Sequence, residues 1–293
     1  MAKVKKQTVK KKVAPKRSGI LGGLKPLTAK PGDEKLKISL YGKAGSGKST
    51  AWSSFPGNIL AIVCSGGRGT NELTSVPVEV RSRITPHYIK ECDEILTLSE
   101  ELQHDTYFDT VVLEHATGVQ DLKLAEILGL SDVPVQRNWG MATRDQYGER
   151  AVNMKHYFRA LFNLIDKHVV IVSQEAEVEL DESFGDLAAI VPSVGPSLSK
   201  SVLAWFNPAS NHIIRTFLRP KTIKKKIKVG KTVKLKEEVV DGEFDYCILT
   251  GPSNIYTTKL RVPRGQHKPE YVNGTNESVY ETIQSIIKGE YKE

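Results

Sequence analysis

The sequence predicts an α/β protein with a mostly parallel sheet, flanked by helices and extended toward its C-terminal side by antiparallel strands. Short, fully apolar runs such as residues 59–63 and 169–172 are typical of strands buried on both faces of a parallel sheet. Segments with apolar residues at helical spacing alternate with such runs through residue 218. Beyond residue 218, lysine-studded strands pivot on Gly230, which indicates an antiparallel hairpin.

Residues 1–35 are predicted to form a disordered basic tail and a linker. The first 17 residues carry eight of the 42 lysines and arginines and no acid, which leaves 34 basic residues against 34 acidic ones in the rest of the chain. The net charge of +8 therefore belongs to the tail, which either binds polyanions or is merely solvated. We expect residues 36–265 to form the main domain, with the hairpin and antiparallel strands in 219–262, and residues 266–293 to end in a helix.

Composition argues against a membrane or a secreted protein. The chain is 39% hydrophobic but contains no run of 18 apolar residues and no apolar N-terminal segment, so we expect a soluble, cytoplasmic protein. Its three cysteines, Cys64, Cys92 and Cys247, form no C-x-x-C pair, which fits reduced thiols and gives no metal site.

The first predicted strand, residues 36–41, leads into a glycine-rich loop. From Gly42 to Ser49 the chain matches G-x-x-x-x-G-K-[ST], the phosphate-binding loop of P-loop nucleotide-binding proteins. We expect its backbone amides to cradle phosphates, Lys48 to neutralise the β- and γ-phosphates and Ser49 to ligate Mg²⁺. A helix should follow over residues 49–55. The predicted ATP-binding residues are Gly42, Lys43, Ala44, Gly45, Ser46, Gly47, Lys48, Ser49 and Thr50.

Residues 108–114 predict a buried strand that ends in an acid, Glu114. Such a strand is typical of a Walker B element, whose carboxylate contacts Mg²⁺ directly or through water, so Glu114 joins Ser49 as a predicted metal ligand. The alternative is an acid that faces solvent at the end of a strand. Before this strand, the sequence predicts strands at residues 58–64 and 76–84 and a helix at 86–103.

The next buried strand, residues 169–173, delivers Gln174 to its carboxyl end. Ligands bind at this edge of open α/β sheets, so Gln174 can approach the γ-phosphate or its attacking water. Lys48, Glu114 and Gln174 are therefore the predicted catalytic residues. The remaining expected helices are residues 119–130, 141–167, 197–206 and 278–288, and the remaining strands are residues 212–218, 221–229, 231–240, 244–249 and 255–262.

In their order along the chain, these landmarks resemble the RecA-like P-loop ATPases of phages, in the AAA-type domain group that includes single-strand annealing recombinases. The resemblance spans about residues 36–265 and rests on the phosphate loop together with Gly66-Gly67, Asp109–Leu113, Leu122–Leu128, Trp139-Gly140, Arg144–Tyr147, Gln174-Glu175 and Lys259–Val262. It implies a RecA-type core, ATP hydrolysis with Mg²⁺ and assembly into homo-oligomeric rings or filaments. It also implies binding of single-stranded DNA in phage recombination or replication, in the host cytoplasm.

Two sets of basic residues follow from this resemblance. ATP lies between subunits in such assemblies, which implies trans-acting roles for Lys259, Arg261 and Arg264; the alternative is solvated residues on an edge strand. The loop after Gln174 is acidic and would repel DNA, so the tail and the hairpin are better candidates, although lysines could serve only to keep the hairpin soluble. The hairpin candidates for DNA binding are Lys221, Lys224, Lys225, Lys226, Lys228, Lys231 and Lys234.

Two departures from the family pattern concern hydrolysis. The Walker B acid is Glu114 where the family usually has Asp, and Ser65 stands where many relatives have the acid that activates water. Glu72, Glu114 or Glu175 could replace that acid, and hydrolysis could be slow while binding persists. A nucleotide-binding scaffold or switch therefore remains an alternative. A small-molecule kinase is disfavoured by the lack of an arginine-rich lid, and the lack of Asn-Lys-x-Asp favours ATP over GTP.

Overall fold

The structure, a computed structural model, describes residues 30–64, 73–130, 142–177, 193–229, 232–275 and 277–292, the side chains of 224–237 excepted. The chain divides after Lys30, and every described helix and strand belongs to the unit Pro31–Glu293. The glycine cluster at 65–69, Glu72, the loop 131–141 and most of the acidic loop at 178–192 lie outside the described residues. Within the described part of the chain, no helix is long and apolar enough to cross a membrane.

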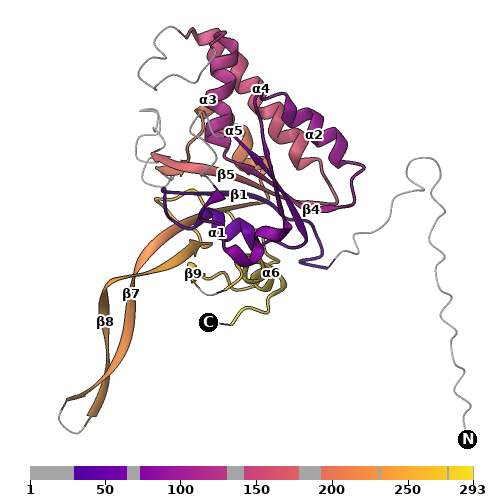
Figure 1. The fold of residues 1–293 in the computed structure, drawn as a ribbon. Coiled ribbons are helices and arrows are strands. Elements are labelled where there is room, and N and C mark those ends of the chain that lie inside the picture. The colour runs from indigo at the N-terminus through magenta and orange to yellow at the C-terminus, as the bar shows by residue number, and fades with distance from the viewer. Residues whose placement is uncertain are drawn as a thin grey trace, which may run out of the picture. The chain divides into compact units, whose positions relative to one another are not determined.

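A mostly parallel sheet forms the centre of this unit, in the order β3-β2-β4-β5-β1-β7-β8-β9 (Figure 1). The strands from β3 to β7 are mutually parallel, whereas β8 and β9 are antiparallel to their neighbours and β6 pairs antiparallel with β5. The strands are β1 (Lys37–Gly42), β2 (Asn58–Val63), β3 (Ile84–Tyr88), β4 (Phe108–Glu114), β5 (His168–Glu177), β6 (Val194–Pro196), β7 (His212–Val229), β8 (Thr232–Leu249) and β9 (Tyr271–Asn273). This is the predicted α/β fold of a P-loop protein, with antiparallel strands at the C-terminal end.

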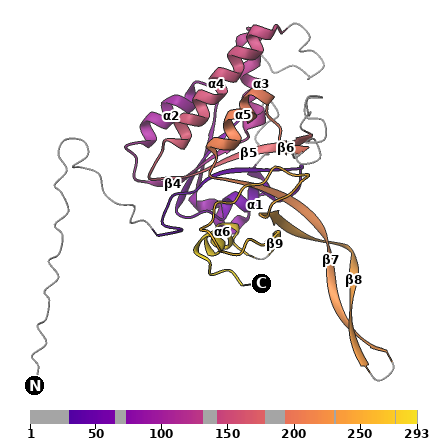
Figure 2. The ribbon, with the colours of Figure 1, turned by 180° about the vertical axis from the view of Figure 1, so that it is seen from behind.

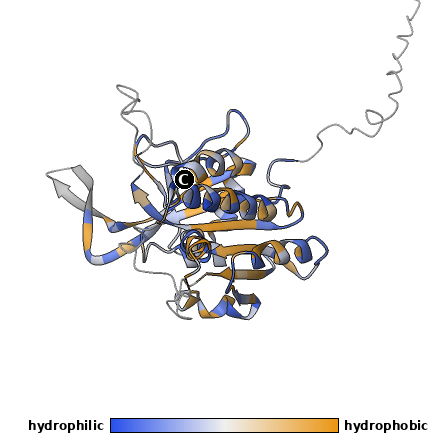
Figure 3. Cartoon of the chain, turned by 90° about the horizontal axis from the view of Figure 1, so that it is seen from above, coloured by the Kyte–Doolittle hydropathy of each residue, from blue (hydrophilic) through white to orange (hydrophobic). Residues whose placement is uncertain are grey.

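Helices cover both faces of the sheet because its central strands alternate their apolar side chains between two cores. Val111 and Leu113 face the core under α2 (Glu94–Leu102), α3 (Ala116–Ile127), α4 (Arg144–Phe162) and α5 (Lys200–Ala209). Val112 and Val172 face the opposite core, under α1 (Lys48–Ser53) and α6 (Val279–Lys288). Figure 2 shows the two helix layers from behind, and Figure 3 shows apolar strands between them.

Three predicted elements are wrong. The strand expected at 76–84 is a 3₁₀ helix, η3 (Val78–Arg83), and the helix expected at 86–103 begins only at Glu94, because Ile84–Tyr88 forms β3 instead. β3 pairs with β2 alone, so Pro86 sits on an edge strand that tolerates its missing N–H. Residues 255–262 make only single bridges, Val194↔Tyr256 and Ile213↔Lys259, because β8 already occupies the edge of β7 from Arg215 onward.

Four separately predicted strands of the hairpin form only two, β7 and β8, which extend as a ribbon away from the rest of the sheet (Figure 1). The break predicted between residues 218 and 221 corresponds to an irregularity in the β7–β8 pairing. There the pairing passes from Pro220↔Phe244 to Thr222↔Val239. The β8 side of this irregularity contains Gly242, whose φ of 77° is closed to most side chains. The other predicted helices are present with shifted ends, and α6 lies within its predicted range.

The register of the strands places the predicted site residues at the same edge of the sheet. Gly42 at the end of β1 lies opposite Gln174 on β5 and opposite Thr216 on β7, so the glycine loop starts between these two residues. β5 separates β1 from β4, which places Gln174 between the loop and Glu114. The carboxyl ends of the strands therefore gather the predicted residues.

Candidate nucleotide-binding site

The loop between β1 and α1 has a conformation that glycine makes possible. Gly45 and Gly47 adopt φ values of 76° and 89°, in the left-handed region that other residues avoid. The loop packs closely on β7, since a Cβ on residue 42 would clash with the backbone oxygen of Thr216. Ser46 Oγ and Thr216 Oγ1 share a 2.6 Å hydrogen bond. No atom would lie within 4 Å of a Cβ on residue 45, so the loop is open there.

Lys48 is buried inside this loop. Its Nζ donates to the backbone oxygens of Gly42 at 2.9 Å and Lys43 at 2.8 Å, and to Gln174 Oε1 at 3.4 Å. Burial lowers the pKa of Lys48, and the nearby carboxylates of Glu114 and Glu175 partly offset that effect. The ammonium is thus held at the centre of the loop by weak neutral acceptors, from which an anionic phosphate could draw it.

Glu114 is buried at the end of β4 and is bound to an unpredicted partner. Trp52, fully buried on α1, donates its indole N–H to Glu114 Oε2 at 2.7 Å. Trp52 follows Lys48 by four residues, so both belong to one face of α1. That spacing is the only sequence signal that could have pointed to Trp52.

Gln174 is positioned by α3. Its backbone N–H donates to Thr117 Oγ1 at 3.2 Å, and the Thr117 hydroxyl donates in turn to the backbone oxygen of Ser197 at 3.1 Å. His115, the neighbour of Glu114, caps α3 by accepting from the backbone N–H of Gly118 at 2.8 Å. Both contacts fix the start of α3 beside the ends of β4 and β5.

A buried ion pair stands on the other side of the loop. Arg215 on β7 donates to both carboxylate oxygens of Glu175, at 2.6 and 3.3 Å, and its guanidinium lies 3.8 Å from the centre of the Tyr256 ring. The side chains of Arg215 and Glu175 are only 10% and 6% exposed. Glu175, one of the three acids considered as a replacement base, is therefore engaged by a neighbouring cation.

The donors present suit Mg²⁺. Ser49 and Glu114 offer hard oxygen ligands, which Mg²⁺ prefers. In the described part of the chain, no three His, Cys, Asp or Glu residues gather into a group that could hold a metal ion. A site of two protein oxygens fits Mg²⁺, which commonly retains waters and binds together with substrate phosphates rather than in a protein cage.

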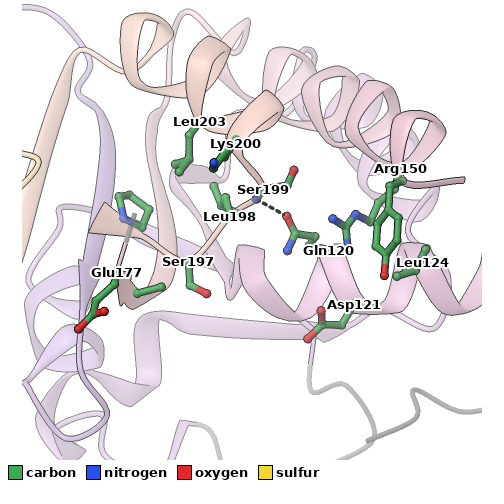
Figure 4. A pocket seen from close by; sticks show the side chains of 13 residues that line it. Gln120, Asp121, Leu124, Arg150, Glu177, Ser197, Leu198, Ser199, Lys200 and Leu203 are labelled. Atoms are coloured by element: carbon green, nitrogen blue, oxygen red, sulfur yellow. Dashed lines mark hydrogen bonds between the residues drawn. The ribbon is translucent and has the colours of Figure 1, made fainter. Parts of the chain in front are cut away.

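A cavity of about 670 Å³ lies beyond Gln174, between α3, α4, β5 and the start of α5 (Figure 4). Arg150 is buried in its wall, and its guanidinium lies 5.0 Å from the centre of the Tyr147 ring. Gln120 Oε1 accepts from the backbone N–H of Ser199 at 2.8 Å and joins α3 to α5. The charged residues that line the cavity are Asp121, Arg150, Glu177 and Lys200. Two of them are basic and two acidic, so the cavity has no clear preference for anions.

The structure places two of the basic residues predicted to act in trans, Lys259 and Arg261, near the start of β7, at the end of β1 opposite the glycine loop. Lys259 donates to the backbone oxygens of Asn207, Pro208 and Ser210 at 3.0, 3.0 and 2.7 Å, which satisfies the end of α5. Arg261 makes a 3.5 Å contact with Asn211 Oδ1, and Arg261 and Arg264 are both exposed. Lys259 and Arg261 are therefore not brought to the nucleotide site of their own chain.

Of the lysines predicted to bind DNA, Lys221 forms an exposed ion pair with Glu243 at 2.6 Å. The backbone of the ribbon pairs Lys224 with Glu237 and Lys225 with Lys236, while Lys226, Lys228 and Lys234 occupy the same two strands. The side chains of these lysines, and the whole of Lys231, lie outside the described residues.

Comparison with known proteins yields one family. A family model described as an AAA domain matches residues 34–243, which is more than half of the 293-residue chain. No curated protein matches this chain. The matched range contains the glycine loop, Glu114, Gln174 and most of the β7–β8 ribbon. The chain therefore belongs to the AAA domain family of P-loop, ATPase-type domains, whose members generally use ATP and Mg²⁺.

Proposed function

We propose that this protein is an ATPase that binds ATP with Mg²⁺ in the Gly42–Thr50 loop and couples the nucleotide to single-stranded DNA. One observation carries the proposal: Lys48 Nζ sits among Gly42 O, Lys43 O and Gln174 Oε1, beside the buried carboxylate of Glu114. A cation, an amide and a carboxylate from three neighbouring strand ends are what phosphoryl transfer to water requires.

Each residue has a distinct task in this site. The loop amides cradle the phosphates, and Lys48 moves from the loop carbonyls to the β- and γ-phosphates, where it offsets negative charge. Ser49 and Glu114 would hold Mg²⁺, which withdraws charge from the phosphates. Gln174, fixed by Thr117, orients the attacking water.

The supply of a general base limits the rate. Glu175 is bound by Arg215 and Glu114 by Trp52, so neither carboxylate accepts a proton from water without first losing part of that contact. We infer slow basal hydrolysis. The same observation favours a second candidate function, a nucleotide-dependent scaffold or switch that binds ATP and hardly turns it over.

The DNA-binding part rests on charge. The two ribbon strands and the N-terminal tail concentrate lysines, and such arrays bind polyanions by releasing counterions. Lys221 is already paired with Glu243, so its contribution should be smaller than that of the lysines nearer the turn. Assembly into rings or filaments, with Arg261 or Arg264 reaching a neighbouring site, and a role in phage recombination or replication complete the proposal on the strength of the family resemblance.

The test is a titration of ATP binding and hydrolysis with and without single-stranded DNA, at low and high salt. Lys48→Ala should abolish binding, Glu114→Gln should remove turnover more than binding, and the exposed Lys90→Ala is the matched control. Charge reversal at Lys224, Lys226 and Lys228 should weaken DNA binding and flatten its salt dependence, whereas Lys10, Lys11 and Lys12→Gln isolate the tail.

Each failure has its own meaning. A protein that does not bind ATP overturns the whole proposal. ATP binding without turnover, in the presence and absence of DNA, supports the switch instead of the ATPase. If single-stranded DNA does not change the rate of ATP hydrolysis, and the protein does not bind DNA at low salt, only the DNA-binding part of the proposal is overturned.

A further inference from the structure

An aromatic ring from the C-terminal half of the chain lies against the phosphate loop. A Cβ on residue 47 would lie 2.8 Å from Cδ1 of Tyr246 on β8, so the ring rests directly on the Gly47 backbone. Tyr246 is nevertheless 46% exposed. One part of the ring thus contacts the loop and the remainder faces solvent beside it.

The sheet order gives the nucleotide site two distinct ends. Lys48 contacts Gln174 on β5, and Glu114 ends β4, so the groups suited to the terminal phosphates lie on one side of β1. Thr216 on β7 and Tyr246 on β8 lie on the other side. Because the lysine of such a loop serves the β- and γ-phosphates, the α-phosphate and the nucleoside point toward β7 and β8.

The chemistry at this second end suits an uncharged group. A shallow cavity of about 30 Å³, room for a water molecule or two, opens there. Its lining contains Thr50, Thr216, Tyr246, Gly274 and Val279, no basic residue, and one carboxylate, that of Glu277. A carboxylate without a basic partner in the lining disfavours phosphates, and the cavity is too small to enclose a base, which would instead lie over the exposed ring at its mouth.

Tyr246 is held in place by the segment that follows β9. Its backbone N–H donates to Thr275 Oγ1 at 2.9 Å, and its backbone oxygen accepts from Gly274 N at 2.7 Å. That segment leads into α6, where the N–H of Tyr280 donates to Ser54 Oγ, one residue beyond α1. The ring is therefore positioned before any ligand binds, which reduces the entropy cost of stacking.

We propose that Tyr246 stacks on the nucleobase of the bound nucleoside triphosphate and separates nucleotides from inorganic polyphosphate. The inference rests on the proposed ATP site and adds a residue beyond the phosphate loop. Stacking on an aromatic ring contributes about 1–3 kcal/mol per base and tolerates any base. Stacking on Tyr246 thus increases the affinity for the nucleoside, and the ring does not distinguish adenine from guanine.

Calorimetric titration of the full chain with Mg·ATP and with inorganic triphosphate tests the assignment. Tyr246→Ala should weaken ATP binding about 5- to 150-fold, the equivalent of that stacking energy, and leave triphosphate binding unchanged. Tyr246→Phe keeps the ring and should bind both ligands as the wild type does. Tyr107→Ala, at an exposed tyrosine that immediately precedes β4, is the matched control.

Two results would overturn the role of Tyr246: unchanged ATP affinity in Tyr246→Ala, or equal weakening of ATP and triphosphate, which would mean that the ring only supports the Gly47 turn. A wild-type protein that binds neither ligand contradicts the phosphate site itself. Lys48→Ala distinguishes these failures, since it should weaken both ligands together.

Discussion

The indole N–H of Trp52 and the carboxylate of Glu114 form a buried 2.7 Å hydrogen bond across 62 positions of sequence. Trp52 lies on the helix that follows the phosphate loop, and Glu114 ends the strand that supplies the predicted Mg²⁺ ligand. The bond fixes one carboxylate oxygen relative to Lys48. The glutamate side chain is thus anchored by the same helix that carries the lysine.

Removing this bond should weaken both stability and turnover. Trp52→Phe keeps an aromatic ring but leaves the Glu114 oxygen without its donor, so the free energy of unfolding should fall by about 2 kcal/mol. Hydrolysis should fall more than ATP binding, because the carboxylate is mispositioned while the loop is intact. Urea unfolding and ATP titration measure the two effects. Trp205→Phe, on α5, is the control, and equal losses in both variants would contradict the assignment.

The Glu175–Arg215 pair should behave as a buried ion pair. Arg215→Met leaves an uncompensated buried carboxylate and should cost about 3–5 kcal/mol of stability, whereas Arg215→Met combined with Glu175→Gln should recover most of that loss. The exposed Lys221–Glu243 pair supplies the comparison, since Lys221→Met should leave the stability almost unchanged. A double-mutant cycle by urea unfolding checks this, and additive losses would mean that the two side chains do not interact.

Two buried histidines should make stability fall in mild acid. Burial, together with Lys35 and Lys37, lowers the pKa of His168 to about 3, and burial together with Arg261 lowers that of His212 to about 4. Between these values and 6.5 the unfolded chain binds more protons than the folded chain, so stability increases with pH. Each histidine should lower the free energy of unfolding by about 2–3 kcal/mol as the pH falls from 6.5 to 4.5.

The measurement is the slope of unfolding free energy against pH over that window. His168→Gln and His212→Gln should each flatten the slope, whatever their effect at neutral pH. The exposed residue His104 supplies the matched control variant, His104→Gln. A slope unaffected by both buried substitutions would mean that neither histidine is held neutral in the folded protein.

Gly42 should tolerate no side chain. In Gly42→Ala the new Cβ would meet the backbone of Thr216, which cannot rotate away, so unfolding should become easier by about 2 kcal/mol or more and ATP binding should fall. Gly129→Ala serves as the control, because its φ of 66° imposes strain of about 1–2 kcal/mol with no atom within 4 Å. Full ATP affinity in Gly42→Ala would show that the loop does not depend on contact with β7.

The sequence predicts those parts of the site whose conformation depends on residues close together in the chain. The glycine and lysine spacing from Gly42 to Ser49 requires a particular turn, and fully apolar runs ending in Glu114 and Gln174 require buried strands. The strands predicted at 76–84 and 255–262 are wrong, because an apolar pattern does not reveal which strand edge is open. The observed ends of α3 and α4 differ from the predicted ends because helix termini depend on capping residues such as His115 and Thr143.

By itself the sequence determined the α/β class and the phosphate-loop motif, and it predicted Lys48, Glu114 and Gln174 as site residues, because each follows from residue types at fixed spacing. Only the tertiary structure decided which side chains meet them. Trp52 reaches Glu114, Arg215 engages Glu175, and Tyr246 rests on Gly47, because the strand order inserts β5 between β1 and β4 and places β7 and β8 on the opposite side. Such contacts join residues 40 to 199 positions apart, and strand order is set by packing of the whole sheet.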